Sequence, residues 1–393
     1  MHNVSELDFG QLPKELKLQI EIMKCKSSEE LNTFGEEWFV NVDWDNFVEI
    51  ALHHRIYSFI YPKMKKINKK LIPDRIYNIF NSYFQMNTFK MLQLSGEMEE
   101  VSKLFMESGI QSIFLKGPVI AKDLYGDISL RTSSDLDVLI PIKDLEKAEQ
   151  LLFQQGYIKD DYIETVLNDW KWRHHHTTYF HPEKNVKIEI HWRLNPGPSK
   201  EPTFIDLWNR RRKSSLTSYP VYFLGKEDLY LFLVAHGARH GWSRLRWLLD
   251  IHFISQQKLD WTKVYRLLKE NQFLQVGGQA LVLSSQLLNT PLLNEMKPLL
   301  SVKNSSRLAQ EAIFYLENMI NLHSDPIPEN VAIYHKRHLF SLMSKQQKLL
   351  FISSFLFPYP EDAEVLPLPK QLHLLYFPLR PFLWAWRKTK KYV

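Results

Sequence analysis

Residues 112–140 read SIFLKGPVIAKDLYGDISLRTSSDLDVLI and contain two apolar runs, separated by a glycine–proline break and a serine-containing turn. The runs Ile113–Leu115 and Asp135–Ile140 each predict a buried strand. Because side chains in a strand alternate between its two faces, the apolar residues of the second run face the core, whereas Asp135 and Asp137 share the opposite face. Carboxylate oxygens are the hard ligands that divalent cations such as Mg²⁺ prefer. This stretch therefore predicts a cation site beside an apolar core.

A third carboxylate comes from Val186–Trp192, where apolar and polar residues alternate again. Glu189 and His191 lie on the polar face of this predicted strand. If it is the neighbour of the strand that carries the aspartates, Glu189 reaches the aspartate pair. Three carboxylates on neighbouring strands form a minimal cage for one or two Mg²⁺ ions that hold a nucleoside triphosphate. We therefore expect the two aspartates and Glu189 to be both the catalytic residues and the metal ligands.

Taken together, these motifs resemble those of the minimal nucleotidyltransferases of the DNA polymerase β superfold. More narrowly, the chain is similar to a bacterial family of uncharacterised nucleotidyltransferases, whose members occur near lasso-peptide and surface-polysaccharide biosynthesis genes. The residues that carry the resemblance are Lys116-Gly117, Arg131, Asp135-x-Asp137 and Glu189-x-His191-Trp192, with Asp43-Trp44, His54-Arg55 and His236–Asp250 further out. The resemblance implies a nucleoside triphosphate (NTP) as the donor substrate and Mg²⁺ as the cofactor.

One position departs from the superfold, which usually carries Gly-Ser after its first strand, with the serine touching phosphate. Here Gly117 is followed by Pro118, so Lys116, Arg131 or a serine of the turn would have to make that contact. For Arg131 the sequence leaves three roles open: a phosphate contact, a residue that holds the aspartates, or a structural ion pair. The nucleotide-binding residues that we expect are Lys116, Gly117, Arg131, Ser133, Ser134, Arg239 and His240.

Histidines form a second group of candidates. Consecutive side chains of His174-His175-His176 point in different directions, so a strand here would turn His174 and His176 toward Glu189. The alternative is a set of polar residues on an edge strand. His236, Arg239 and His240 are spaced for one face of a helix, which either lines the nucleotide cleft or belongs to the core. The substrate contacts that we expect are His174, His176, His191 and His236.

Composition and charge limit the function classes. The chain has 393 residues, and its 50 Lys and Arg against 44 Asp and Glu give a net charge of +6, which suits an anionic small molecule without demanding nucleic acid. The single Cys25 excludes an internal disulfide and a cysteine-based zinc site. The polar N-terminus does not resemble a signal peptide, and no long apolar run predicts a transmembrane helix. We therefore expect a cytoplasmic protein without a nucleic-acid partner.

The order of the patterns predicts an α+β fold, in which helices pack on a small mixed nucleotidyltransferase sheet and helical N- and C-terminal regions flank it. We expect four parts: a helical region (1–95), the α/β core (96–198), a helical domain (199–345) and a proline- and aromatic-rich tail (346–393). The prolines of the tail disfavour long helices, and its end, FLWAWRKTKKYV, is first aromatic and then basic. The tail is expected to wrap onto the body, and the alternative is a peripheral contact with a membrane surface or a partner.

The sequence thus predicts an enzyme that moves a nucleoside monophosphate from an NTP, such as ATP, to a hydroxyl or phosphate of a small molecule or peptide. Tailoring of a lasso-type peptide would fit the family resemblance. Two alternatives remain open. The same metal site would also serve the transfer of a sugar or sugar phosphate from a nucleotide-activated donor. In the other alternative the chain is a non-catalytic nucleotide-binding module.

Overall fold

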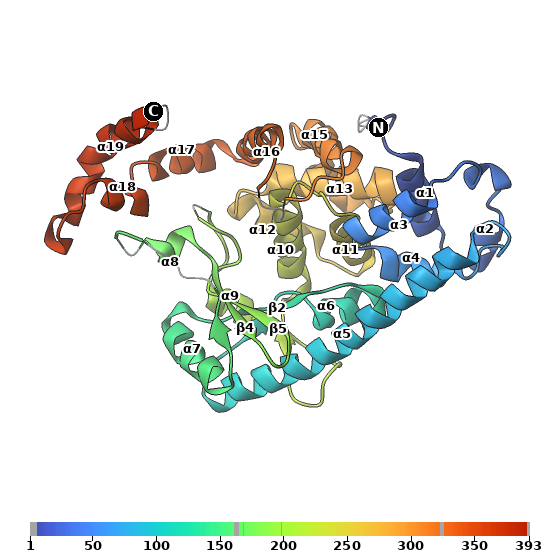
Figure 1. Cartoon of the computed structure of the whole chain (residues 1–393), viewed down its shortest axis with the longest axis horizontal. Coiled ribbons are helices and arrows are strands. Elements are labelled where there is room, and N and C mark those ends of the chain that lie inside the picture. The colour runs from blue at the N-terminus through green and yellow to red at the C-terminus, as the bar shows by residue number, and fades with distance from the viewer. Residues whose placement is uncertain (1–5, 161–164, 168, 198, 323–325, 391–393) are drawn as a thin grey trace.

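The computed structural model describes residues 6–160, 165–167, 169–197, 199–322 and 326–390. Pro198, at which the core was predicted to end, lies outside the described residues, as do the first five and the last three residues of the chain. Figure 1 shows an elongated molecule, with the N-terminal helices at one end and the tail at the other. Between them lies a sheet that has a long helix along one side and a second group of helices on the other.

Among the described residues, seven strands form one mixed sheet in the order β3-β4-β5-β2-β1-β7-β6. Their bounds are β1 Ile113–Phe114, β2 Asp135–Leu139, β3 Ile158–Lys159, β4 His176–His181, β5 Val186–His191, β6 Arg212–Lys213 and β7 Tyr222–Phe223. The central strands β2 and β5 are parallel neighbours, and β4 and β5 are antiparallel. This mixed sheet, flanked by helical regions, confirms the predicted α+β class.

The pairing of β2 with β5 determines where the carboxylates lie. In this parallel ladder Asp135 is opposite Lys187, and Asp137 is opposite Glu189. Adjacent strands lie about 4.8 Å apart, so the side chains of Asp137 and Glu189 leave the sheet next to each other on one face. The apolar residues that alternate with them are fully buried on the other face; they are Leu136, Val138, Ile188 and Ile190.

The N-terminal region is helical, as the spacing of its apolar residues predicted. Its helices are α1 Lys14–Lys24, α2 Ser28–Asn32, α3 Trp44–His53, α4 Tyr57–Met64 and α5 Asp74–Glu107. Asp43 caps α3, because its carboxylate accepts hydrogen bonds from the backbone N–H groups of Asp45 and Asn46. α5 has 34 residues and runs without a break through 95–96, where the sequence placed a domain boundary. The other domain boundaries stay predictions.

The helices of the core are short, and the helical domain follows them. The core helices are α6 Pro118–Ile120, α7 Leu145–Gln154, α8 Trp170–Arg173 and α9 Phe204–Asn209. The next helices are α10 Lys226–Arg239, α11 Leu245–Gln256, α12 Trp261–Glu270, α13 Leu274–Leu288, α14 Lys297–Leu300, α15 Ser305–Glu317 and α16 Glu329–Leu342. Gly237 in α10 lets the ring of Trp242 pack directly on the helix, since a Cβ there would stand 2.2 Å from the ring. A core tryptophan therefore fills the space that this glycine leaves.

A buried ion pair joins the core to the helical domain. Arg131, in the segment that enters β2, donates two hydrogen bonds to the carboxylate of Asp250 in α11, at 2.8 and 2.9 Å. Both side chains are almost fully buried, and the Tyr125 hydroxyl donates to the same carboxylate at 2.8 Å. From the preceding turn of α11, Arg246 donates to the carbonyl oxygen of Thr132. These contacts hold the chain that leads into β2 against α11.

The tail is more helical and more exposed than the sequence analysis expected. It forms α17 Lys345–Ser354, α18 Pro360–Val365 and α19 Tyr376–Lys390. Pro378 lies in the first turn of α19, where a helix tolerates proline, although Pro381 lies further inside. Phe382, Trp384 and Trp386 are 73, 54 and 57% exposed, and Figure 1 shows α18 and α19 extending away from the sheet. These three side chains are therefore largely exposed, whereas Phe357 and Tyr359, earlier in the tail, contact Trp172 and Arg173 of α8.

No helix in the described part of the chain is long and apolar enough to cross a membrane. The alternative to a tail that wraps onto the body is a peripheral contact of the tail with a membrane surface or a partner. Exposed aromatic residues of α19 followed by basic ones are the composition that such a contact needs. The peripheral contact stays a prediction.

We expect Asp250→Ala to lower the free energy of unfolding by about 3–5 kcal/mol, because it leaves the Arg131 guanidinium buried without a counter-charge. Urea unfolding followed by circular dichroism measures this loss. The matched control is Asp45→Ala, which breaks the exposed pair between Asp45 and Arg75 and should cost at most about 1 kcal/mol. Equal losses in the two variants would contradict a structural role for the buried pair.

Candidate active site

The carboxylates of β2 and β5 open into a cavity of about 460 Å³. The sheet forms one wall of this cavity, and α10 with the start of α11 forms the other. The lining residues are Arg55, Lys116, Ser134, Asp135, Asp137, His175, His176, Lys187, Glu189, His191, Pro196, Phe232, His236, Arg239, His240, Arg244, Arg246 and Trp247. The carboxylates all lie on the sheet wall, whereas the helix wall carries arginine and histidine but no carboxylate.

The sheet wall brings several metal-ligating atoms together. Single ligand atoms of Asp137, Glu189 and His191 lie within 4.8 Å of one another. His191 Nε2 is 3.1 Å from Asp137 Oδ1 and 3.4 Å from Glu189 Oε2, and Lys116 Nζ is 2.9 Å from Asp137 Oδ1. Asp135 lines the same cavity from two residues earlier on β2. The structure therefore gathers the three predicted carboxylates in one cavity, and it adds a histidine and a lysine to them.

The charges of this wall compensate one another. Burial raises the pKa of Asp137, but the Lys116 ammonium and the hydrogen bond with His191 outweigh burial and hold that pKa below its ordinary value. Burial also opposes ionisation of Glu189, yet His191, His176 and Lys116 lower its pKa to about 2. Burial lowers the pKa of His191, but the hydrogen bonds with both carboxylates outweigh burial. The pKa of His191 therefore lies above its ordinary value. Both carboxylates are thus ionised at neutral pH, as metal ligands must be.

One oxygen atom of the sheet wall has no partner. Asp137 Oδ2 is buried, and no hydrogen bond to it is found among the described residues. A buried carboxylate oxygen without a partner is costly, and a bound cation removes that cost. A set of carboxylate oxygens is also the donor set that Mg²⁺ prefers. Asp135, Asp137 and Glu189 therefore fit a divalent cation.

The part of the chain that forms this cavity matches a known protein family. Residues 41–289 match the model of a family described as uncharacterised nucleotidyltransferase. The chain belongs to this family. The match contains the sheet and every residue that lines the cavity, and it ends after α13. No curated protein and no solved structure matches the chain.

The helix wall of the cavity carries an excess of positive charge. Arg239 Nη1 and Arg246 Nε are buried, and the described part of the chain offers neither atom a hydrogen-bond partner. Burial lowers the pKa of Arg239 to about 10, and burial with the repulsion of Arg131 and Arg55 lowers that of Arg246 to about 9. The pKa of Arg244 is lowered to about 10 by burial and by Arg55. A bound anion would stabilise the charged form of these neighbouring arginines, which repel one another. Phosphate suits this role, because it can accept two hydrogen bonds from one guanidinium group.

Most of the residues that were predicted to bind nucleotide or substrate line this cavity. They are Lys116, Ser134, His176, His191, His236, Arg239 and His240. Arg131 does not, because its guanidinium is held by Asp250 and only 2% of the residue is exposed. Of the three roles that the sequence left open for Arg131, the geometry supports the structural ion pair. The Ser133 hydroxyl also points elsewhere and donates to the carbonyl oxygen of Asp135, at 3.2 Å.

Two further predicted residues lie outside the lining. Gly117 shapes the turn after β1: its φ is +82°, and a Cβ would stand 3.5 Å from the side chain of Leu136. His174 follows the last turn of α8, so the alternation expected for a strand does not apply to it. His175 lines the cavity in its place, with its ring centroid 4.3 Å from that of His176 and 5.4 Å from that of His191.

Besides His175, the ionisable lining residues that were not predicted as site residues are Arg55, Lys187, Arg244 and Arg246. The segments His54-Arg55 and His236–Asp250, which carry the family resemblance, contain three of them. The alternation of β5 is a signal for Lys187, since it shares the face of Glu189. Arg55 follows α3 with a φ of +54°, and Arg244 immediately precedes α11. These two positions depend on how distant helices pack on the sheet, and no local pattern in the sequence reports that.

We expect Mn²⁺, used as a paramagnetic substitute for Mg²⁺, to bind the wild-type protein at least about tenfold more tightly than the Asp135→Asn/Asp137→Asn variant. The amide oxygens that replace the carboxylates carry no charge to offset that of the cation. Electron paramagnetic resonance of free Mn²⁺ during a titration measures the affinity. Asp45→Asn, on the exposed surface of α3, should bind as the wild type does. Equal affinity of the wild type and the double variant would place the metal elsewhere.

Proposed function

We propose that the protein is a Mg²⁺-dependent nucleotidyltransferase that moves a nucleoside monophosphate from an NTP to a hydroxyl or phosphate of a small-molecule or peptide acceptor. The observation that carries this proposal is the opposition of two charged walls in one cavity. Asp137 and Glu189 on the sheet wall fit a cation, and Arg239 and Arg246 on the helix wall have buried nitrogens that fit an anion. A triphosphate with its counter-cation combines both charges. Membership of the nucleotidyltransferase family supports the same class of reaction.

In this reaction an oxygen of the acceptor attacks the α-phosphorus of the triphosphate. The new O–P bond forms while the bond from the α-phosphorus to the oxygen shared with the β-phosphorus breaks, and pyrophosphate leaves with that electron pair. Mg²⁺ held by Asp135, Asp137 and Glu189 would supply positive charge to the phosphate oxygens. A cation held by Glu189 would lower the pKa of an acceptor hydroxyl, and Glu189, directly or through that cation, would favour removal of the hydroxyl proton.

The helix wall positions the phosphates for this attack. Arg239 and Arg246 project from α10 and α11; Arg246 is buried and Arg239 is half-buried with its Nη1 inaccessible to solvent, so neither guanidinium group is free in solvent. Fixed donors hold the triphosphate in line with the acceptor, which lowers the entropic part of the barrier. His236 Nδ1 lies 3.3 Å from Arg239 Nη2 and helps to orient it. Burial keeps the pKa of His236 well below its ordinary value, so this histidine stays neutral beside the arginine.

Incubation with Mg²⁺, each of the four common NTPs and candidate acceptors, followed by mass spectrometry, tests the proposal. ATP is included among the donors and a lasso-type peptide among the acceptors. We expect the acceptor to gain the mass of one nucleoside monophosphate while pyrophosphate is released. The Asp135→Asn/Asp137→Asn variant should give no product and an unchanged circular dichroism spectrum. A hexose gained from a nucleotide-activated sugar would show sugar transfer instead, and nucleotide binding without any product would show a non-catalytic binding module.

Glu189→Gln keeps the size of the side chain but removes its charge and its ability to take a proton. We expect kcat to fall at least about a hundredfold, the usual scale for a group that transfers a proton in the transition state. Pyrophosphate release measures the rate. Glu183→Gln, an exposed change in the turn between β4 and β5, is the matched control and should leave the rate unaltered. A fully active Glu189→Gln would make Glu189 a structural residue of the strand.

A further inference from the structure

A second cavity adjoins the candidate active site and has a different character. Its volume is about 290 Å³, and Arg239 and Pro196 line both cavities. Apart from Arg239, α10 contributes Ala235 and Ala238, and the segment between α12 and α13 contributes Phe273. The rest of the described lining is also mostly apolar. The two cavities therefore meet at one arginine, with phosphate-binding groups on one side and hydrocarbon on the other.

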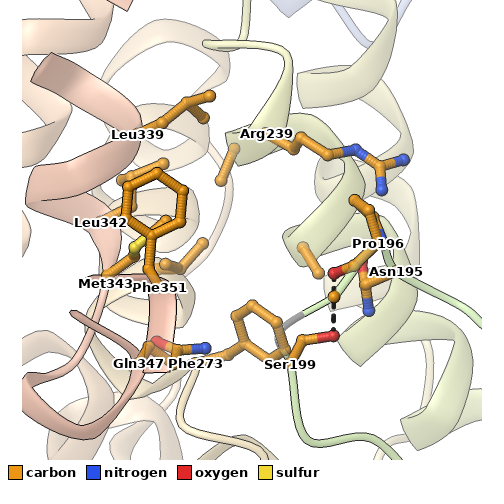
Figure 2. Close-up of a pocket in the computed structure, with 14 residues that line it drawn as sticks. Asn195, Pro196, Ser199, Arg239, Phe273, Leu339, Leu342, Met343, Gln347 and Phe351 are labelled. Carbon is orange, nitrogen blue, oxygen red and sulfur yellow. Dashed lines mark hydrogen bonds between the residues drawn. The ribbon is translucent and has the colours of Figure 1, made fainter. Parts of the chain in front are cut away.

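The outer wall of this second cavity comes from helices that follow the family segment. Leu339, Leu342, Met343 and Phe351 belong to α16, α17 and the short connection between them, whereas the family match ends at residue 289. Figure 2 shows these four side chains on one side of the cavity, with Arg239, Pro196 and Asn195 on the other. The part of the chain outside the family match thus shapes this cavity, and the family segment alone forms the walls of the active site.

Two polar groups at the margin, from Ser199 and Gln347, already have partners within the protein. The Ser199 hydroxyl donates to the carbonyl oxygen of Pro196 at 3.1 Å, as the dashed line in Figure 2 marks. The side-chain oxygen of Gln347 accepts the backbone N–H of Ser344 at 2.8 Å. A nucleotide base needs donors and acceptors along its edge, and few are available here. An apolar group makes no such demand, and it removes apolar surface from water when it enters.

We propose that this second cavity binds the apolar part of the acceptor, an aromatic ring or a short aliphatic chain, while the acceptor's hydroxyl or phosphate reaches past Arg239 into the active site. The inference rests on the proposed nucleotidyl transfer and narrows its acceptor to an amphipathic small molecule or an apolar side chain of a peptide. The volume is sufficient, because a cavity of about 150 Å³ already holds benzene. Arg239 lines both cavities and its Nη1 is buried, so the polar end of such an acceptor would pass this side chain.

A series of n-alkyl phosphates from ethyl to octyl, titrated calorimetrically without NTP or metal, tests the cavity separately from catalysis. Each additional buried CH₂ should tighten binding about three- to fourfold until the cavity is full. In Phe351→Glu a carboxylate enters the apolar wall, so octyl phosphate should bind at least tenfold more weakly while ethyl phosphate binds as before. Leu350→Glu places the same charge on the neighbouring residue, which is 51% exposed and does not line the cavity, and should match the wild type.

If Phe351→Glu fails to fold, Met343→Glu, at a half-buried lining position, replaces it in the same series. Affinity that is independent of chain length, or an equal loss in Phe351→Glu and Leu350→Glu, overturns the inference. Nucleotide transfer to acceptors without an apolar group, at the same kcat/KM as to those with one, also overturns it and leaves the proposed function standing. If binding depends on chain length but no acceptor is modified, the proposed function is overturned, whereas the inference that the second cavity binds an apolar group stands.

Discussion

The buried ion pair between Arg131 and Asp250 is the contact on which both walls of the active site depend. The pair connects the segment that enters β2 to α11, across 119 residues of sequence. Taking two charges out of water costs several kcal/mol for each ion, so such a pair contributes little net stability compared with apolar packing. Its two parallel hydrogen bonds instead impose one relative position. In that position the carboxylates of β2 and the arginines at the start of α11 face each other across the cavity.

The two walls carry opposite charges, and each has buried polar atoms that lack a partner in the described chain. Asp137 Oδ2 on one side and Arg239 Nη1 on the other could have been satisfied by a direct contact between the walls. Instead a cavity of about 460 Å³ separates them. Folding therefore leaves polar groups desolvated at a cost that only ligands of complementary charge offset. This arrangement is typical of a site that is organised before its substrate arrives.

Local patterns in the sequence predicted the parts of this site that lie on strands. Alternation indicated that Asp135 and Asp137 share one face of their strand and that Glu189 lies on the polar face of its own, and the parallel pairing of β2 and β5 put the three on one face of the sheet. The same reasoning failed at His174 and His175, because β4 begins only at His176, two residues after His174. Arg131 was ambiguous for another reason: whether an arginine pairs with a carboxylate or with a phosphate depends on a partner far away in the sequence. The wall that α16 and α17 add to the second cavity has no local signal, since apolar residues of a helix do not reveal what they face.

The long helix α5 has a mechanical consequence. At about 1.5 Å per residue its 34 residues span about 51 Å, and Figure 1 shows it running from the N-terminal helices along the sheet. Asn87 donates to the carbonyl oxygen of Ser129 at 2.8 Å, and Glu97 accepts a hydrogen bond from the hydroxyl of Tyr157 at 2.6 Å. These two contacts hold α5 against the connections that flank the strands. A hinge between these two regions would have to break a continuous helix. Any opening that admits a bulky substrate would therefore come from the opposite side, by displacement of helices that the Arg131–Asp250 pair does not hold, such as α16 and α17.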